Sequence, residues 1–285
     1  MRFVKLIRTI LVSALFSQAV AAHSPHDVIE ALAATDQGPD GTVLFAILAG
    51  NLLTRSQDGG ASWKDMSHGL DNRYSYTGVA AATVKHSQLM AFAATDGDGV
   101  YRSTDGGERW AISNKGLSNL RLANVVVSND FANDQHVAAV GTQGGLFLSS
   151  DAGENWRSIL DAEVGVTALC FCQPGDPDTL LVGDSDGIIR LTRDGGEFWE
   201  SLSATPAAAG EITSIASLNA EADQLSVLIG TEAAGVYRSD DAGRTLVQQS
   251  TGLTDLNVRD ILVFNALSGR KRVLASTWRS GIFLS

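Results

Sequence analysis

The chain has 285 residues, of which 44% are hydrophobic and 19% are charged, a composition that excludes an intrinsically disordered protein. Its net charge of −11 argues against a nucleic-acid partner and against an anionic membrane surface, because both carry negative charge themselves. The two cysteines, Cys170 and Cys172, lie two residues apart in an apolar run, and we expect buried thiols and no disulfide framework.

Residues 1–22 have the layout of a secretory signal peptide. Three basic residues come first, residues 9–22 carry no charge, and small residues precede position 22. We therefore predict a signal peptide over residues 1–22, a mature domain over residues 23–285, and a periplasmic or secreted location. The uncharged stretch is short for a membrane span, so we expect no stable membrane insertion after cleavage. The alternative is that Leu6–Leu15 forms the first strand of the fold.

A short motif recurs five times along the rest of the chain, as SQDGGASW, STDGGERW, SSDAGENW, TRDGGEFW and SDDAGRTL. We call these segments the boxes. Their aspartates are 47, 46, 43 and 47 residues apart, and self-similarity at a period of 40 to 50 residues is typical of a propeller or a solenoid. The repeated acids and indoles are Asp58 and Trp63, Asp105 and Trp110, Asp151 and Trp156, Asp194 and Trp199, and Asp241, which Leu246 follows in place of tryptophan.

The pattern between boxes is that of β-strands. In the second unit, residues 79–84, 89–95, 99–103 and 109–113 are short apolar or alternating runs separated by turn residues. Four strands in a unit of this length predict one propeller blade, and no stretch has the pattern of an amphipathic helix. The predicted fold is an all-β propeller of four-stranded blades.

The third strand of the unit gives the number of blades. GVYRS at residues 99–103 is matched four more times, and for the last time by GIFLS at residues 281–285. Blades then start near residues 27, 77, 122, 165, 211 and 257, so we predict six blades, the last with three strands. Its missing strand could come only from the predicted signal peptide. Either the sixth blade stays three-stranded or the signal-peptide prediction is wrong.

The boxes are expected to be turns between the third and fourth strands. Aspartate and serine can accept hydrogen bonds from backbone N–H groups of their own turn, glycine permits a positive φ, and tryptophan can pack on the neighbouring blade. One aspartate per box supplies too few oxygen ligands for calcium. The acids at Asp96, Asp98, Asp184 and Asp186 are interpreted as ordinary turn residues, and we predict no metal and no cofactor.

The boxes resemble the Asp-box or bacterial neuraminidase repeat, whose motif is S-x-D-x-G-x-x-W. The resemblance covers residues 27–285 and implies a β-propeller with the boxes on a rim away from the working face. Proteins with such repeats include sialidases, xyloglucan-cleaving glycosidases, sortilin-like sorting receptors and photosystem II assembly factors, so the resemblance alone does not choose a function.

The resemblance to the enzymes is incomplete. The Phe-Arg-Ile-Pro stretch typical of sialidases does not occur in the sequence. Xyloglucanases use two larger propellers, and this chain predicts one small one. Glycosidases need two carboxylates about 5 to 10 Å apart, and the sequence singles out no such pair. We therefore expect a non-catalytic protein-binding or assembly scaffold, with a glycoside hydrolase of sialidase or xyloglucanase type as the alternative.

Residues that depart from the repeat are the candidates for binding, because positions shared by the units serve the fold. Aromatic and basic residues replace small or acidic ones in the loops opposite the boxes, and we expect them to form a surface for a protein partner or a glycan. The alternative is that they are solvated residues paired with acids such as Asp71 and Asp260. The candidates are Arg73, Tyr74, Tyr76, Arg121, Arg259, Trp278 and Arg279.

Overall fold

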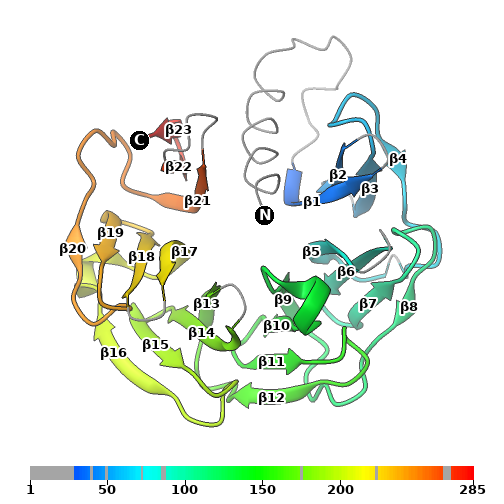
Figure 1. Cartoon of the computed structure of the whole chain (residues 1–285), viewed down its shortest axis with the longest axis horizontal. Helices are drawn as coiled ribbons and strands as arrows, with labels where there is room; N and C mark the ends of the chain where they lie inside the picture. Colours follow the sequence, from blue (N-terminus) through cyan, green and yellow to red (C-terminus); the bar gives the residue numbers. More distant parts are fainter. Residues whose placement is uncertain are drawn as a thin grey trace. The chain divides into compact units, whose positions relative to one another are not determined.

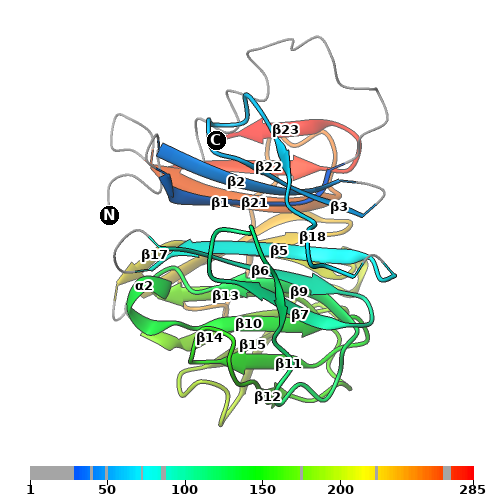
Figure 2. The same cartoon turned by 90° about the vertical axis from the view of Figure 1, so that its right-hand side faces the viewer.

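The computed structural model describes residues 29–38, 41–48, 51–71, 73–84, 88–173, 176–221, 224–265 and 271–285. The predicted signal peptide, and with it the alternative strand Leu6–Leu15, lies outside the described residues. The described chain forms six antiparallel sheets, and neighbours in sequence are neighbours in each sheet (Figures 1 and 2). This is the predicted β-propeller, and the sixth sheet has three strands where the other five have four.

Contacts divide the chain into two compact units. The first unit comprises the chain up to Thr142 together with Leu146–Ser158. Its strands are β1 (Ile29–Gly38), β2 (Gly41–Leu48), β3 (Leu52–Ser56) and β4 (Lys64–Asp65) in the first sheet; β5 (Tyr76–Thr83), β6 (Leu89–Thr95), β7 (Gly99–Ser103) and β8 (Ala111–Ile112) in the second; and β9 (Leu122–Val127), β10 (Val137–Gly141), β11 (Leu146–Ser149) and β12 (Arg157–Leu160) in the third, of which β12 runs on into the second unit.

The second unit comprises Gln143–Gly145 and Ile159–Ser285. Its strands are β13 (Val166–Gln173), β14 (Asp176–Asp184), β15 (Ile188–Thr192) and β16 (Glu200–Ala204) in the fourth sheet; β17 (Ile212–Glu221), β18 (Gln224–Thr231), β19 (Gly235–Ser239) and β20 (Val247–Gln248) in the fifth; and β21 (Val258–Asn265), β22 (Lys271–Thr277) and β23 (Gly281–Leu284) in the sixth. The thiols of Cys170 and Cys172 are both buried and form no disulfide, and burial raises the pKa of Cys172.

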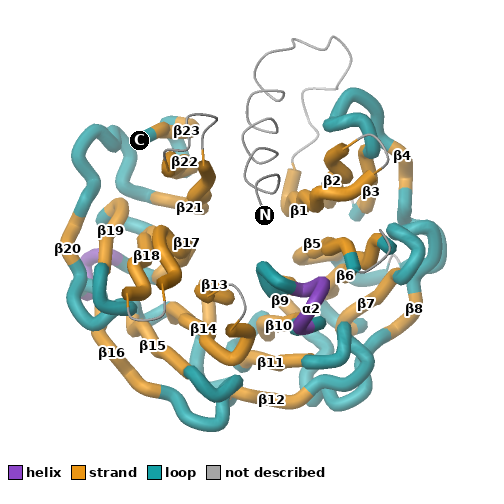
Figure 3. Tube along the Cα trace, in the orientation of Figure 1, coloured by secondary structure: helices purple, strands orange, loops and turns teal. Residues whose placement is uncertain are grey.

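Within the described residues, helix occurs only in short segments between strands (Figure 3). The helix α2 (Phe131–Asp134) is one such segment that the periodicity did not predict, because four residues are too few to show a helical repeat. The Ser128 hydroxyl donates to the Asp134 carboxylate at 2.5 Å, and this hydrogen bond closes the turn that contains the helix. The helix delivers the buried ring of Phe131 edge-on to Phe92, with ring centroids 5.8 Å apart.

Each box forms a hydrogen-bonded turn after the third strand of its sheet. In the second box the Ser103 hydroxyl donates to the Asp105 carboxylate and accepts from the Gly107 N–H, both at 2.8 Å. The carboxylate also accepts from the Arg109 N–H at 2.9 Å. Gly106 has a φ of +72°, in the left-handed region that glycine adopts without strain. The same serine or threonine bridge to the aspartate recurs in the other four boxes.

Three of the four box tryptophans hydrogen-bond to the sheet that precedes their own. The indole N–H of Trp110 donates to the Met66 carbonyl at 2.8 Å. The indole of Trp156 donates to Ser113 at 2.7 Å, and that of Trp199 to Ile159 at 2.7 Å. The indole of Trp63 instead donates to Gly60, within its own turn.

Acid should weaken the box turns. Hydrogen bonds from the Ser62 side chain and backbone lower the pKa of Asp58 to about 2, and the backbone N–H of Phe198 lowers that of Asp194. A lowered carboxyl pKa gives stability that is present above the unfolded value of about 3.9 and is lost as the pH falls through the folded value. We expect the melting temperature to fall between pH 4 and pH 2, and to fall less in Asp58→Asn. Equal slopes in a pH series of melting curves would contradict this role of Asp58.

Candidate functional site

The seven predicted binding residues divide between the two units. Arg73, Tyr74, Tyr76 and Arg121 belong to the first, and Arg259, Trp278 and Arg279 to the second. Within each unit the residues lie in, or directly beside, loops that join the second strand to the third or the fourth strand to the next sheet. The two groups are therefore described separately.

Trp278 is the aromatic residue of the second group. It lies in the turn between β22 and β23, where its backbone N–H donates to the Asn257 carbonyl at 2.9 Å. Its side chain is 63% exposed. The guanidinium of Arg259, on β21, lies 5.2 Å from the centre of the indole, within range for a cation–π interaction. The second group thus presents a cation stacked on an exposed indole.

Asp255 fixes the turn that carries Trp278. Its carboxylate accepts from the backbone N–H groups of Asn257 at 3.0 Å and Arg279 at 2.6 Å, and these hydrogen bonds lower its pKa. Arg279 is itself exposed. Asp260, suggested as an ion-pair partner from the sequence, accepts from the Ser214 hydroxyl at 2.9 Å. The Asp255 carboxylate therefore orders the turn that carries Trp278, while Arg259 is placed by β21.

In the first group both arginines are paired with nearby acids. Arg73 Nη2 lies 2.5 Å from Asp71 Oδ2, and Arg121 Nε lies 2.9 Å from Asp96 Oδ1. These hydrogen bonds lower the pKa of Asp71 and of Asp96. The geometry matches the alternative weighed from the sequence, in which loop arginines pair with neighbouring carboxylates.

The two tyrosines of the first group differ in accessibility. Tyr76 is 1% exposed, its N–H donates to Asn51 Oδ1 at 2.6 Å, and its hydroxyl donates to the Asp71 carbonyl at 3.3 Å. Its ring therefore packs in the core, although Tyr76 stands among the expected binding residues. Tyr74 is half-buried, and its ring lies so close to Gly97 that a Cβ there would be 2.3 Å from Tyr74 Cδ1.

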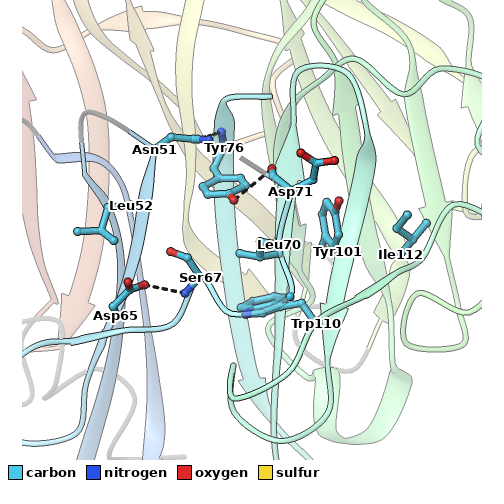
Figure 4. A pocket seen from close by; sticks show the side chains of 11 residues that line it. Asn51, Leu52, Asp65, Ser67, Leu70, Asp71, Tyr76, Tyr101, Trp110 and Ile112 are labelled. Atoms are coloured by element: carbon cyan, nitrogen blue, oxygen red, sulfur yellow. Dashed lines mark hydrogen bonds between the residues drawn. The ribbon is translucent and has the colours of Figure 1, made fainter. Parts of the chain in front are cut away.

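A pocket of about 780 Å³ between the first and second sheets is a feature that the sequence analysis missed. Figure 4 shows Leu52 and Ile112 on opposite sides of it, with Leu70 and Trp110 between them. The sequence feature that could have indicated this pocket is the loop of residues 66–75, the longest loop between two sheets of the described chain. The lining residues are Asn51, Leu52, Asp65, Ser67, Gly69, Leu70, Asp71, Tyr76, Tyr101, Trp110 and Ile112.

Neither a metal centre nor a membrane-spanning helix is found in the part of the chain that the structure describes. No three His, Cys, Asp or Glu side chains there gather in a way that could hold a metal ion. No helix there has the length and apolar character needed to cross a bilayer.

The sheets and their repeats define the class of protein as a β-propeller of the bacterial neuraminidase-repeat type. The family model described as photosynthesis system II assembly factor YCF48 matches residues 112–261, more than half of the chain. The chain belongs to this family. No curated protein sequence matches it.

Solved structures share the fold at low sequence identity. YCF48 bound to D1 peptide superposes with a TM-score of 0.64 at 14% identity, covering 93% of this chain and 80% of that one. YCF48 from Cyanidioschyzon merolae gives 0.53 at 14% identity, covering 89% and 94%. The GH74 enzyme of Niastella koreensis gives 0.61 at 17% identity, covering 92% of this chain and 38% of the enzyme. The chain therefore spans well under half the length of that enzyme.

Proposed function

We propose that the chain is a non-catalytic β-propeller, secreted or periplasmic, that binds a protein partner as an assembly scaffold. The observation that carries the proposal is the exposed indole of Trp278 with the guanidinium of Arg259 stacked on it. Tryptophan and arginine are the residues most enriched among those that dominate protein–protein binding energies. Membership of the YCF48 family supports the same conclusion, because the family is described by an assembly role.

The chemistry of the pair favours an extended, acidic peptide segment of the partner. The Arg259 guanidinium can donate paired hydrogen bonds to a carboxylate, and the indole face offers apolar contact beside it. On a chain with a net charge of −11, such a basic site is a local exception. One YCF48 structure is bound to D1 peptide, and we propose that this chain also recognises a peptide.

Affinity capture from the host cell envelope tests the proposal. The mature wild-type protein should recover a discrete protein that is lost with the variant Arg259→Ala/Trp278→Ala/Arg279→Ala. Phe198→Ala is the matched control, because Phe198 is 69% exposed but lies in the fourth box. Equal recovery by wild type and the triple variant would refute the site.

The alternative of a glycosidase has weaker support. Such an enzyme needs a carboxylic acid with a raised pKa beside a second carboxylate. In the pocket of the first unit, the Arg73 side chain lowers the pKa of Asp71. A carboxyl with a lowered pKa is suited to an ion pair and not to the role of a general acid, which must carry a proton. We expect no hydrolysis of xyloglucan or sialosides by the purified protein. Release of reducing sugar or sialic acid that scales with protein concentration would overturn this expectation.

The proposed location makes a separate prediction. If residues 1–22 are a signal peptide, protein recovered from the host should begin at His23 and lack three basic residues, so its net charge would be three units more negative, −14 instead of −11. Intact-mass measurement of the protein from a periplasmic or culture-supernatant fraction checks this. A full-length mass, or recovery only with the cytoplasm, would contradict the location without affecting the binding site.

A further inference from the structure

We propose that the pocket between the first and second sheets is a second binding site, which takes a basic, amphipathic peptide segment of a partner protein. A lysine or arginine side chain would enter beside Asp65 and Asp71, and apolar side chains on either side of it would rest on Leu52 and on Ile112. The site goes beyond the proposed function, because it uses none of the residues around Trp278 and selects the opposite charge.

Charge is the first argument for a cationic occupant. Two carboxylates line the pocket, those of Asp65 and Asp71, and none of the lysines and arginines that the structure describes lines it. Asp71 is paired with Arg73, whose side chain is 74% exposed and lies outside the lining. A third carboxylate, that of Asp98, accepts a hydrogen bond from the hydroxyl of the lining residue Tyr101. A cation entering here therefore meets more carboxylates than guanidinium groups.

The carboxylate of Asp65 leaves hydrogen-bond acceptor positions open in the pocket. The Asn51 side chain already donates to the Tyr74 carbonyl at 2.7 Å and accepts from Tyr76. The Trp110 indole N–H already donates to the Met66 carbonyl. Each carboxylate has about four acceptor positions, and Asp65 accepts from the Ser67 N–H at only one of its oxygens, at 2.8 Å. The vacant positions match an ammonium or guanidinium group, which carries only donors.

The rim of the pocket favours a peptide over a sugar. Leu52 is 36% exposed and Ile112 is 59% exposed, so each could be covered by an apolar side chain of the peptide. The three aromatic rings of the lining, those of Tyr76, Tyr101 and Trp110, are buried. They offer no open face on which a sugar ring could stack.

The test is an NMR titration of the mature protein with matched peptides. The probe is acetyl-LKGRL-amide, and its acidic counterpart is acetyl-LEGEL-amide. We expect the Ile112 methyl and Trp110 indole N–H signals to shift saturably with the basic peptide only. Ile112→Ser and Asp65→Asn should each weaken binding by about 10-fold, the loss expected for one apolar contact or one charge-assisted hydrogen bond. Asparagine at position 65 keeps an acceptor for the Ser67 N–H, so the variant should fold.

Two further variants and one further ligand make the test decisive. Phe198→Ser alters an exposed side chain outside the pocket and should leave binding unchanged. Trp278→Ala should also leave it unchanged, which separates this site from the one in the proposed function. Absence of a saturable shift at Ile112, equal binding of the acidic peptide, or the same shifts on adding xyloglucan oligosaccharides would each overturn the proposal.

Discussion

Replacing Trp156 with alanine is expected to lower the free energy of unfolding by about 3–5 kcal/mol, the usual cost of removing a buried indole. The side chain is buried and belongs to a core cluster with Phe92 and Phe131. Its indole N–H also satisfies the Ser113 carbonyl at 2.7 Å, which the variant would leave without this donor. The indole therefore contributes both packing and a hydrogen bond between two successive sheets.

Trp63 provides the matched control. It has the same place in its box, but it is only partly buried and its indole donates to Gly60 of its own turn at 3.1 Å. Trp63→Ala should therefore cost clearly less than Trp156→Ala. Urea unfolding of the two variants and the wild type, followed by circular dichroism, measures the difference. Equal losses would show that the link from Trp156 to the preceding sheet adds nothing to stability.

Replacing Trp278 with alanine is expected to weaken partner binding by about 30-fold or more, corresponding to the roughly 2 kcal/mol that defines a dominant interface residue. The reason is that the indole is exposed in the free protein and would be covered by the partner. Because the side chain contributes little to the core, the melting temperature should stay close to that of the wild type.

The arginine beside it should contribute less on its own. Arg259→Ala removes an exposed cation–π interaction, worth about 0.5–1 kcal/mol, and a donor to the partner. Arg73→Ala is the comparison, since Arg73 is already paired with Asp71. Surface plasmon resonance with the captured partner should rank the losses as Trp278, then Arg259, then Arg73. A larger loss for Arg73 than for Trp278 would move the binding site to the first unit.

The repeat carried most of the information about the fold. The alternation in residues 99–103 predicts β7 (Gly99–Ser103) with the bounds that the structure has, and 89–95 likewise predicts β6. The match of residues 281–285 to the third strand of other units predicted a sixth sheet of three strands. The helix α2 was missed because its turn depends on Ser128 and Asp134, two residues outside any repeated pattern.

The site was less predictable, because exposure and pairing depend on contacts between segments far apart in the sequence. Tyr76 stands outside the repeat in sequence but inside the core in space, where Asn51 binds its backbone. Arg121 pairs with Asp96, which lies 25 residues earlier on the neighbouring sheet. Asp71, two residues before Arg73, was close enough in sequence to suggest its ion pair in advance.

Photo-crosslinking in intact host cells tests the central claim most directly. A photoreactive phenylalanine analogue would replace Trp278 in one variant and Phe198 in another, since both side chains are well exposed, at 63% and 69%. A protein-binding scaffold predicts a discrete crosslinked protein from position 278 that is absent from position 198. No crosslinked protein from position 278, or the same products from both positions, would contradict the proposed function.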